Sequence, residues 1–152
     1  MPRQRVLFIC THNSARSQMA EAMLRVMGGD EFEPYSAGTE ATRVRAEAIA
    51  VMAEVGIDIS GQESKTLDRF LQQPFDWLIT VCDNARQNCP IFPGVEQTAH
   101  WGVDDPAEVQ GSEARRLEAF RQARDDLRNR IRLFITTASR IDLPRDAATL
   151  GA

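Results

Sequence analysis

Short apolar runs alternate along this chain with longer stretches whose apolar residues have helical spacing. Residues 6–9 and 77–81 form two such runs. Each run is followed directly by a cysteine, Cys10 or Cys82, and then by polar residues. Short runs that are apolar throughout are typical of strands buried on both faces. Two weaker strands are expected over residues 33–37 and 95–101. The pattern therefore predicts four strands.

Helical stretches lie between and after these strands. The first two helices are expected to end at glycines, Gly28 and Gly56. The longest helix is expected to begin near Ser112, as N-cap, and to end near Arg140, before Pro144. The expected buried positions are Met19, Ala22, Met23 and Val26 on the first helix, Ala48, Met52 and Val55 on the second, and Leu117, Phe120, Leu127, Ile131 and Phe134 on the longest.

Alternating strands and helices predict an α/β fold with right-handed crossovers. We expect three layers: an open, four-stranded parallel sheet with helices on both faces. One domain is expected over residues 1–152, with residues 141–152 loosely ordered. Ligands of such sheets bind beyond the carboxyl ends of the strands, where Cys10 and Cys82 are expected to lie.

Composition narrows the function. Of the 152 residues, 43% are hydrophobic and 26% are charged, and the net charge of −4 argues against a nucleic-acid partner. The apolar run near the N-terminus is too short for a signal peptide or a membrane span, so a cytoplasmic protein is expected. A monomer is the default expectation, which no feature of the sequence tests. Three cysteines in a reducing compartment indicate thiol chemistry or burial rather than structural disulfides.

The strongest local motif is a C-x5-R loop between the first strand and the first helix. Its backbone N–H groups and the helix dipole predict an anion nest, in which Arg16 grips two oxygens of a tetrahedral oxyanion. Cys10, at the base of this cup, is expected to be a thiolate nucleophile, and Ser17 its hydrogen-bond donor. Taken singly, Cys10 and Arg16 would more often be a buried cysteine and a solvated arginine. The expected oxyanion-binding residues are Thr11, His12, Asn13, Ser14, Ala15 and Arg16, with no catalytic role for His12.

Residues 10–21 resemble the low-molecular-weight tyrosine phosphatase superfamily, and especially its arsenate reductase branch. The resemblance covers residues 5–135. It implies the fold of that superfamily and the reduction of arsenate to arsenite. Its further landmarks are Ser36-Ala37-Gly38-Thr39, Gly56-Ile57-Asp58-Ile59-Ser60, Val81-Cys82-Asp83 through Cys89-Pro90, His100-Trp101-Gly102 and Asp104-Asp105-Pro106.

The resemblance assigns the general acid to Asp105, which would protonate the leaving oxygen. Without it, Asp104-Asp105-Pro106 would be read as a turn and a helix start. Phosphatases of the superfamily place aromatic residues after this proline, whereas here Ala107 and Glu108 follow, and the only tyrosine, Tyr35, is distant. A small oxyanion is therefore expected in place of phosphotyrosine: arsenate as substrate, with phosphate or sulfate as other occupants of the loop.

Reduction of arsenate requires two electrons, and the other two cysteines are their expected source. The resemblance implies that Cys82 attacks the Cys10 adduct and that Cys89 then attacks Cys82. We expect residues 82–89 to be helical or compact when reduced and to rearrange when oxidised. The alternatives are that Cys82 and Cys89 are core residues, or that they form a zinc site with His12 or His100.

The resemblance also implies an external reductant and a candidate cation. Two resolving cysteines favour thioredoxin, although relatives coupled to glutaredoxin and mycothiol exist. No tightly bound cofactor is expected, but Asn13, Glu21 and Ser36 match the potassium ligands of some relatives. Glu63 departs from that pattern, where a small hydroxyl residue is common. The rival functions are a phosphatase, which would also be a weak side activity of a reductase, and a non-enzymatic oxyanion or redox sensor.

Overall fold

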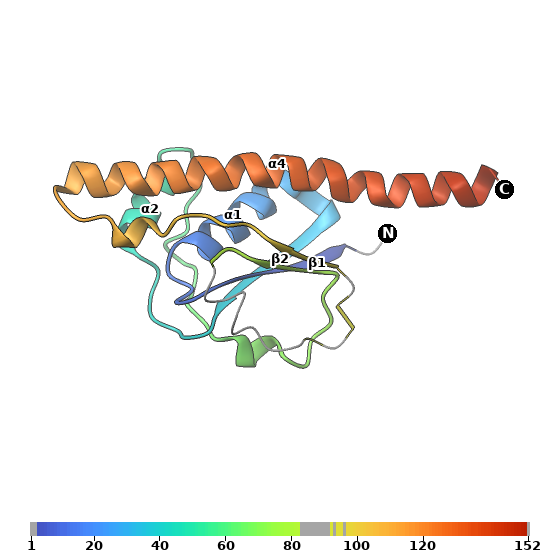
Figure 1. Ribbon diagram of the computed structural model, residues 1–152, viewed down its shortest axis with the longest axis horizontal. Coiled ribbons are helices and arrows are strands. Elements are labelled where there is room, and N and C mark those ends of the chain that lie inside the picture. The colour runs from blue at the N-terminus through green and yellow to red at the C-terminus, as the bar shows by residue number, and fades with distance from the viewer. Residues whose placement is uncertain (1–2, 83–91, 93, 96, 152) are drawn as a thin grey trace.

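The four strands form one parallel sheet in the order β2-β1-β3-β4 (Figure 1). The computed structural model describes residues 3–82, 92, 94, 95 and 97–151, with side chains described up to Ser139. The sequence correctly predicts all four strands, although the fourth is shorter than expected. Their bounds are β1 Gln4–Cys10, β2 Phe32–Gly38, β3 Trp77–Thr80 and β4 Gln97–His100.

Helices and 3₁₀ turns cover the sheet in layers, as the alternating pattern predicts. In Figure 1 the long helix α4 runs along one side of the sheet with α1 beneath it, and the short turn η2 lies on the other side. The bounds are α1 Arg16–Gly28, η1 Gly29–Glu31, α2 Ala46–Ala53, η2 Leu67–Phe70, η3 Pro106–Glu108 and α4 Glu113–Gly151.

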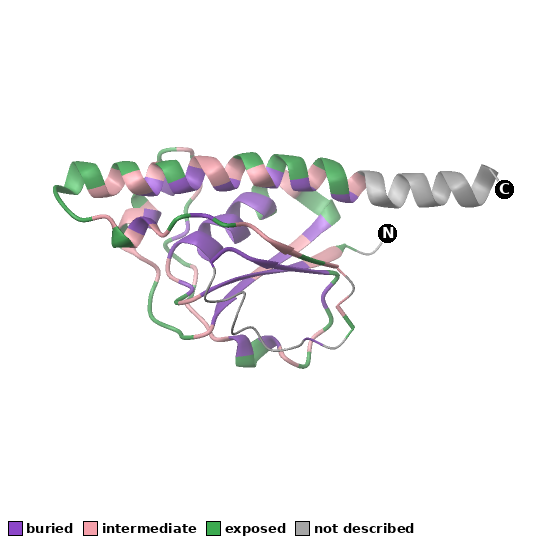
Figure 2. Ribbon diagram, in the orientation of Figure 1, coloured by how far each residue is buried: buried purple, intermediate pink, exposed green. Residues whose placement is uncertain are grey.

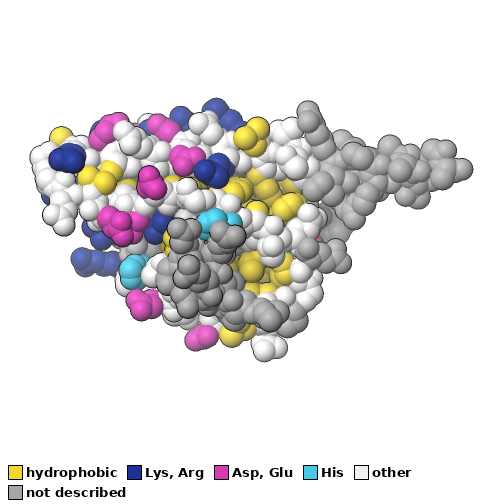
Figure 3. Space-filling model, in the orientation of Figure 1, with side chains coloured by type: hydrophobic (Ala, Val, Ile, Leu, Met, Phe, Trp, Pro, Cys, Tyr) yellow, Lys and Arg dark blue, Asp and Glu magenta, His cyan; other side chains and the backbone are white. Residues whose placement is uncertain are grey.

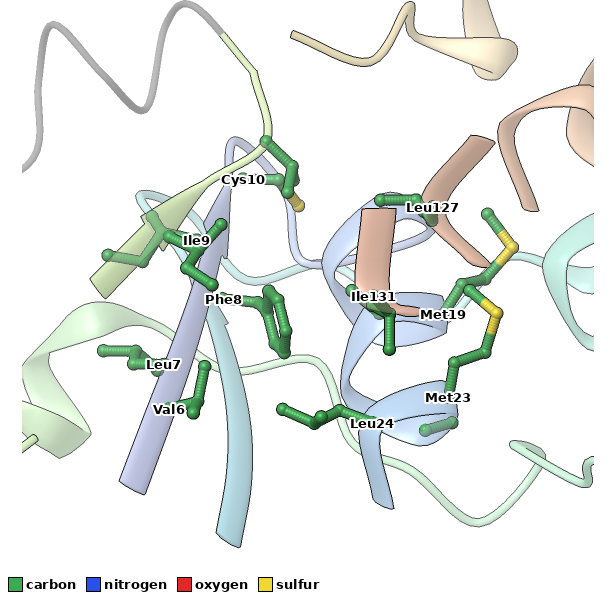
Figure 4. Packing of buried hydrophobic residues seen from close by; sticks show 14 of the residues in the cluster. Val6, Leu7, Phe8, Ile9, Cys10, Met19, Met23, Leu24, Leu127 and Ile131 are labelled. Atoms are coloured by element: carbon green, nitrogen blue, oxygen red, sulfur yellow. The ribbon is translucent and has the colours of Figure 1, made fainter. Parts of the chain in front are cut away.

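Residues of β1 alternate between two parts of the core. Figure 4 shows Phe8 directed toward α1 and α4, and Leu7 on the opposite side. On the side of the long helix, Phe134 of α4 packs edge-on against Trp77, with ring centroids 5.0 Å apart. On the other side, Tyr35 packs against Phe70 and Phe75, and the Arg5 guanidinium lies over the rings of Tyr35 and Phe75. The core thus fixes β1 from both faces.

The buried stripe of α4 confirms the predicted helix face. Phe120, Leu127, Ile131 and Phe134 are buried, and Leu117 packs against them. Figure 2 shows this stripe facing the sheet while the opposite side of the helix is exposed. Acidic and basic side chains are interspersed along the part of α4 seen in Figure 3. The Ser112 side chain accepts a hydrogen bond from the Arg115 backbone N–H, as an N-cap does.

Three details of the predicted helices are wrong. Val55, expected on the buried face of the second helix, lies beyond the end of α2 at Ala53 and is only half-buried. Val26, expected to be buried, is 62% exposed, because the last turn of α1 leaves the core after the buried Leu24. Helix α4 continues to Gly151 rather than ending near Arg140. A proline removes one intrahelical hydrogen bond and bends the helix locally, so Pro144 alone does not set the end of α4.

In the described part of the chain, no helix has the length and apolar content needed to cross a bilayer.

Candidate active site

The C-x5-R loop connects the end of the central strand to the first turn of α1. Cys10 is the last residue of β1, and Ala15 is the N-cap of α1 without a capping side chain. Neighbouring backbone holds the loop from outside: the N–H of Glu40 donates to the carbonyl of Thr11 at 2.9 Å, and that of Arg45 to the carbonyl of Ser14 at 2.9 Å. The loop is therefore held by main-chain bonds that leave its interior to a ligand.

Two residues give the loop its close-packed form. Asn13 has a φ of +50°, a left-handed conformation that asparagine tolerates better than most residues. Gly38 of β2 lies against the loop: a Cβ on it would be 2.7 Å from the carbonyl oxygen of Thr11 and 2.8 Å from the nitrogen of Asn13. Only glycine allows the strand and the loop to approach this closely.

The proposed nucleophile belongs to a short hydrogen-bonded chain. Cys10 is 3% exposed, and its Sγ lies 2.8 Å from the Oγ of Ser17, which is fully buried. Asn13 Nδ2 donates to the same Oγ at 2.8 Å. Because Asn13 donates to the oxygen of Ser17, the hydroxyl proton is available to Cys10. The geometry fits the role predicted for Ser17 as a donor to the thiolate.

Arg16 and Asp105 face each other across the opening of the loop. Arg16 is 9% exposed, and its Nη1 donates to the carbonyl of Val103 at 2.9 Å. Its Nη2 lies 3.5 Å from Oδ2 of Asp105. The other oxygen of Asp105 accepts a hydrogen bond from the N–H of Ala107, so Asp105 also begins η3. The alternative helix start is therefore observed at Asp105, and its position beside Arg16 is compatible with the predicted role of acid.

Cys82 reaches the same loop from the neighbouring strand. β3 pairs with β1 directly, and the Val81 N–H donates to the carbonyl of Ile9 at 2.9 Å. Cys82 is buried, with Sγ 3.1 Å from the Thr11 hydroxyl oxygen. The prediction that Cys82 lies beside the nucleophile loop is therefore confirmed in position. Cys89 and the rest of the predicted rearranging segment, residues 83–89, lie outside the described residues.

Two adjoining cavities open at this end of the sheet. The larger, about 500 Å³, lies where the strand order changes direction between β1 and β3, the usual ligand site of such sheets. Thr11, His12, Arg16, Cys82, Gly102, Val103, Asp104, Asp105 and Glu108 line it. The smaller, about 270 Å³, is lined by Cys10, His12, Ser14, Ala15, Arg16, Arg45, Asp105, Ala107 and Glu108.

No phenylalanine, tyrosine or tryptophan is among these lining residues, which are all described. Tyr35 instead belongs to the aromatic group beneath the sheet, where its hydroxyl donates to Glu33. Among the described residues, a phosphotyrosine ring would find no phenyl, phenol or indole ring to stack on there. The cavities fit a small oxyanion better.

A group of polar residues lies behind the loop, of which the sequence analysis identified Glu21 and Ser36 but not Lys65. Glu21 and Ser36, the candidate potassium ligands, are buried and hydrogen-bonded to each other. The Lys65 ammonium lies 3.7 Å from Glu21 Oε1. Burial lowers the pKa of Lys65 below its ordinary value, and the charge of Glu21 opposes this shift. The Glu63 side chain, which departs from the potassium pattern, is paired with Arg69 at the surface.

Three residues at the site, Lys65, Glu108 and Arg45, were not identified as functional candidates from the sequence. Lys65 lies 52 positions from Asn13, and no local pattern marks it. Glu108 and Arg45 line the cavities, Glu108 both of them and Arg45 the smaller. Glu108 lies two positions after Pro106, where phosphatases of the superfamily have aromatic residues that contact the substrate. This position in the sequence could have identified Glu108 as a residue of the cavity. His12, half exposed, lies 3.4 Å from Glu40 and makes no contact with Cys10 among those the structure describes.

Fold and site together define an α/β protein with a thiol at the end of a buried strand, a strand–loop–helix turn after it, and an arginine facing a carboxylic acid beside that turn. The chain belongs to the low molecular weight phosphotyrosine protein phosphatase family, whose model matches residues 5–142. This confirms the family resemblance of the motifs and the fold class that it implies.

Several relatives of this chain are named arsenate reductases. The chain is 43% identical to an arsenate reductase of Halalkalibacterium halodurans over 137 residues, 90% of this chain and 99% of that protein. Among solved structures, it is similar to an arsenate reductase in an oxidised state, with a TM-score of 0.76, 35% identity and coverage of 88% and 98%. An arsenate reductase in a phosphate-binding state gives a TM-score of 0.73 at 34% identity, with the same coverage.

Proposed function

We propose that this protein reduces arsenate to arsenite, with Cys10 as nucleophile and with Cys82 and Cys89 as resolving cysteines. The observation that carries the proposal is that two cysteines from adjacent strands reach one oxyanion loop: Cys10 at its start, and Cys82 against Thr11. Hydrolysis of a phosphate ester needs only the first. The relatives named arsenate reductases support the same activity.

Arsenate would bind in the loop and replace Val103 and Asp105 as the partner of the Arg16 guanidinium. The guanidinium can turn from Val103 and Asp105 to two substrate oxygens, while N–H groups at the start of α1 receive the others. The Cys10 thiolate then attacks arsenic, and a sulfur–arsenic bond forms. One oxygen leaves as water after protonation, with Asp105 as the donor.

The redox step moves one electron pair. The Cys82 thiolate attacks Cys10 Sγ, so that a sulfur–sulfur bond forms and the sulfur–arsenic bond breaks. The electron pair of the broken bond stays on arsenic, which leaves as arsenite. Cys89 then attacks Cys82 and releases Cys10 as a thiolate. A dithiol reductant such as thioredoxin reduces the Cys82–Cys89 disulfide, in a reducing compartment such as the cytoplasm.

The test is arsenate-dependent oxidation of NADPH by the full chain in the presence of thioredoxin and thioredoxin reductase. Cys82→Ser should abolish this turnover but keep phosphate affinity and any hydrolysis of p-nitrophenyl phosphate. Cys10→Ser should abolish both activities. Arsenate turnover by Cys82→Ser at the rate of the unaltered protein would disprove the relay.

A phosphatase is the second candidate, because Cys10, Arg16 and Asp105 suffice for hydrolysis of a phosphate monoester. The lack of aromatic residues among those lining the cavities disfavours aryl substrates. Rapid hydrolysis of a phosphate ester together with no arsenate-dependent NADPH oxidation would favour this candidate over the reductase.

A further inference from the structure

A buried group of polar side chains supports the oxyanion loop from behind. This rear cluster consists of Asn13, Glu21, Ser36 and Lys65. Asn13 and Ser36 are fully buried, Glu21 is 6% exposed, and the Lys65 side chain is 12% exposed. A carboxylate buried in this way needs a cation and hydrogen bonds to remain charged. Half-exposed Arg25 pairs with Oε2 of Glu21, so the cluster still requires a positive charge beside the inner oxygen, Oε1.

The Lys65 ammonium supplies that charge. It donates to the carbonyl of Glu63 at 2.9 Å and to Ser36 Oγ at 3.4 Å, and it lies 3.7 Å from Glu21 Oε1. These three acceptors match the three donors of an ammonium group. They are a carboxylate, a hydroxyl and a carbonyl, the oxygen types that bind a hard monovalent cation.

A potassium ion does not fit the same residues. Asn13 Oδ1 already accepts from the Lys65 backbone N–H at 2.9 Å and from Gln18 Nε2 at 2.8 Å. Glu21 Oε1 accepts from Ser36 at 2.7 Å and faces Lys65, while its Oε2 accepts from Arg25. A metal ion there would displace these bonds and meet two cationic side chains around one carboxylate.

Hydrogen bonds connect the cluster to the nucleophile. The Lys65 backbone N–H donates to Asn13 Oδ1, and Asn13 Nδ2 donates to Ser17 Oγ, which lies 2.8 Å from Cys10 Sγ. Lys65 thus orients the Asn13 amide through its main chain, and its ammonium shares the pairing of Glu21 with Arg25. The ammonium also holds the carbonyl of Glu63, so its loss would loosen the main chain at Lys65 and reach Cys10 through Asn13 and Ser17.

We propose that the Lys65 ammonium is a built-in cation of the oxyanion loop, occupying the position that the family resemblance assigns to potassium, and a positioning residue for Cys10. The protein is therefore independent of potassium. The proposal rests on the proposed nucleophilic role of Cys10, but its test measures Cys10 reactivity and phosphate binding rather than arsenate reduction. The two can therefore fail separately.

The composition of the chain agrees with this assignment. Lys65 is the only lysine among the 18 lysine and arginine residues of the sequence. An ammonium group is a compact point charge, whereas a guanidinium is a wide planar fork. A site of potassium size accepts the first and excludes the second.

The experiment compares the full chain with Lys65→Met, which keeps the length of the side chain and removes its charge. The rate at which iodoacetamide alkylates Cys10 is followed on the tryptic peptide of residues 6–16. Phosphate affinity is measured by calorimetry. Both are recorded in choline chloride, lithium chloride and potassium chloride at equal ionic strength. Arg25→Met is the matched control, because Arg25 pairs with Glu21 but is half exposed.

The unaltered protein and Arg25→Met should give the same values in all three salts. Lys65→Met should be alkylated about tenfold or more slowly in choline, the usual effect of losing a supporting partner of a site, and potassium but not lithium should restore the rate. A purely structural loss would not depend on the size of the added cation.

Three results would overturn the proposal. Lys65→Met reacting as the unaltered protein does in choline would exclude a positioning role. A slow variant that potassium does not restore would exclude the role of a built-in cation. A potassium response in the unaltered protein would exclude independence from the ion, and this measurement stands even if the variant does not fold.

Discussion

The approach of Gly38 to the oxyanion loop makes one added methyl group a sharp probe of the site. A Cβ on Gly38 would lie 2.6 Å from the carbonyl oxygen of Glu40 and 2.7 Å from that of Thr11, whereas ordinary contact begins at 3.4 Å. It would also lie 2.8 Å from the nitrogen of Asn13. These are backbone atoms that cannot rotate away. Gly38→Ala should therefore displace the loop by about 0.6–0.8 Å relative to β2.

A displacement of this size acts on catalysis more than on folding. Misplacement of reacting groups by about 1 Å can lower a rate about 100-fold, equivalent to about 2.7 kcal/mol of transition-state stabilisation. Overpacking costs about 1–3 kcal/mol of folding free energy, less than the roughly 5–15 kcal/mol of a typical domain. Gly38→Ala should thus remain folded and lose most of its activity.

The assay pairs arsenate-dependent NADPH oxidation with phosphate affinity and with urea unfolding. Gly61→Ala is the matched control, because its added methyl group meets no atom within 4 Å. The control should match the unaltered protein in all three measurements. Undiminished phosphate affinity and turnover in Gly38→Ala would refute the idea that the close approach of β2 shapes the loop.

Three further predictions concern the core, the surface ion pairs and the arginine. Phe134→Ala, which removes the ring packed on Trp77, should cost about 3–5 kcal/mol in urea unfolding, whereas the exposed neighbour Leu133→Ala should change stability by no more than about 0.5 kcal/mol. Hydrogen bonds from Arg121 and Arg124 lower the pKa of Glu54 to about 2, so its stabilising effect is complete above the ordinary pKa of 4.5 and is lost toward pH 2. The melting temperatures of Glu54→Gln and the unaltered protein should accordingly differ near neutral pH and converge near pH 2; a constant difference would contradict this. Arg16→Lys keeps the charge but loses the fork and should weaken phosphate binding by about 1.5–3 kcal/mol in calorimetry, and unchanged affinity would argue against two-pronged binding.

The sequence predicts the strand, loop and helix around Cys10 well because their signals are local. An apolar run, small polar residues and an amphipathic stretch follow one another within 25 residues, from Gln4 to Gly28. The same locality explains the errors at Val26 and at Pro144. Val26 has the correct helical spacing, but whether it is buried depends on where α1 leaves the core, and Pro144 was treated as a stop without knowing the rest of the helix.

Contacts between distant parts of the chain could not be predicted in this way. Arg16 was expected to point at a substrate, but the carbonyl it contacts belongs to Val103, 87 positions away. The charge of Lys65 is placed behind the loop by the turn that leads into η2, and nothing in its neighbours indicates a buried position. Such residues become functional candidates only when the fold brings them together.

The start of α1 links occupancy of the site to the stability of the whole molecule. Ala15, at the N-cap, has no side chain that can accept a hydrogen bond from the first turn. An oxyanion in the loop would act as the missing cap, and a ligand that binds only the folded chain at 100 times its dissociation constant adds about 2.7 kcal/mol of stability. Phosphate in the cell would then have two opposing effects on an arsenate reductase of this design. It would compete with the substrate for the loop, and at the same time it would protect the idle protein from unfolding.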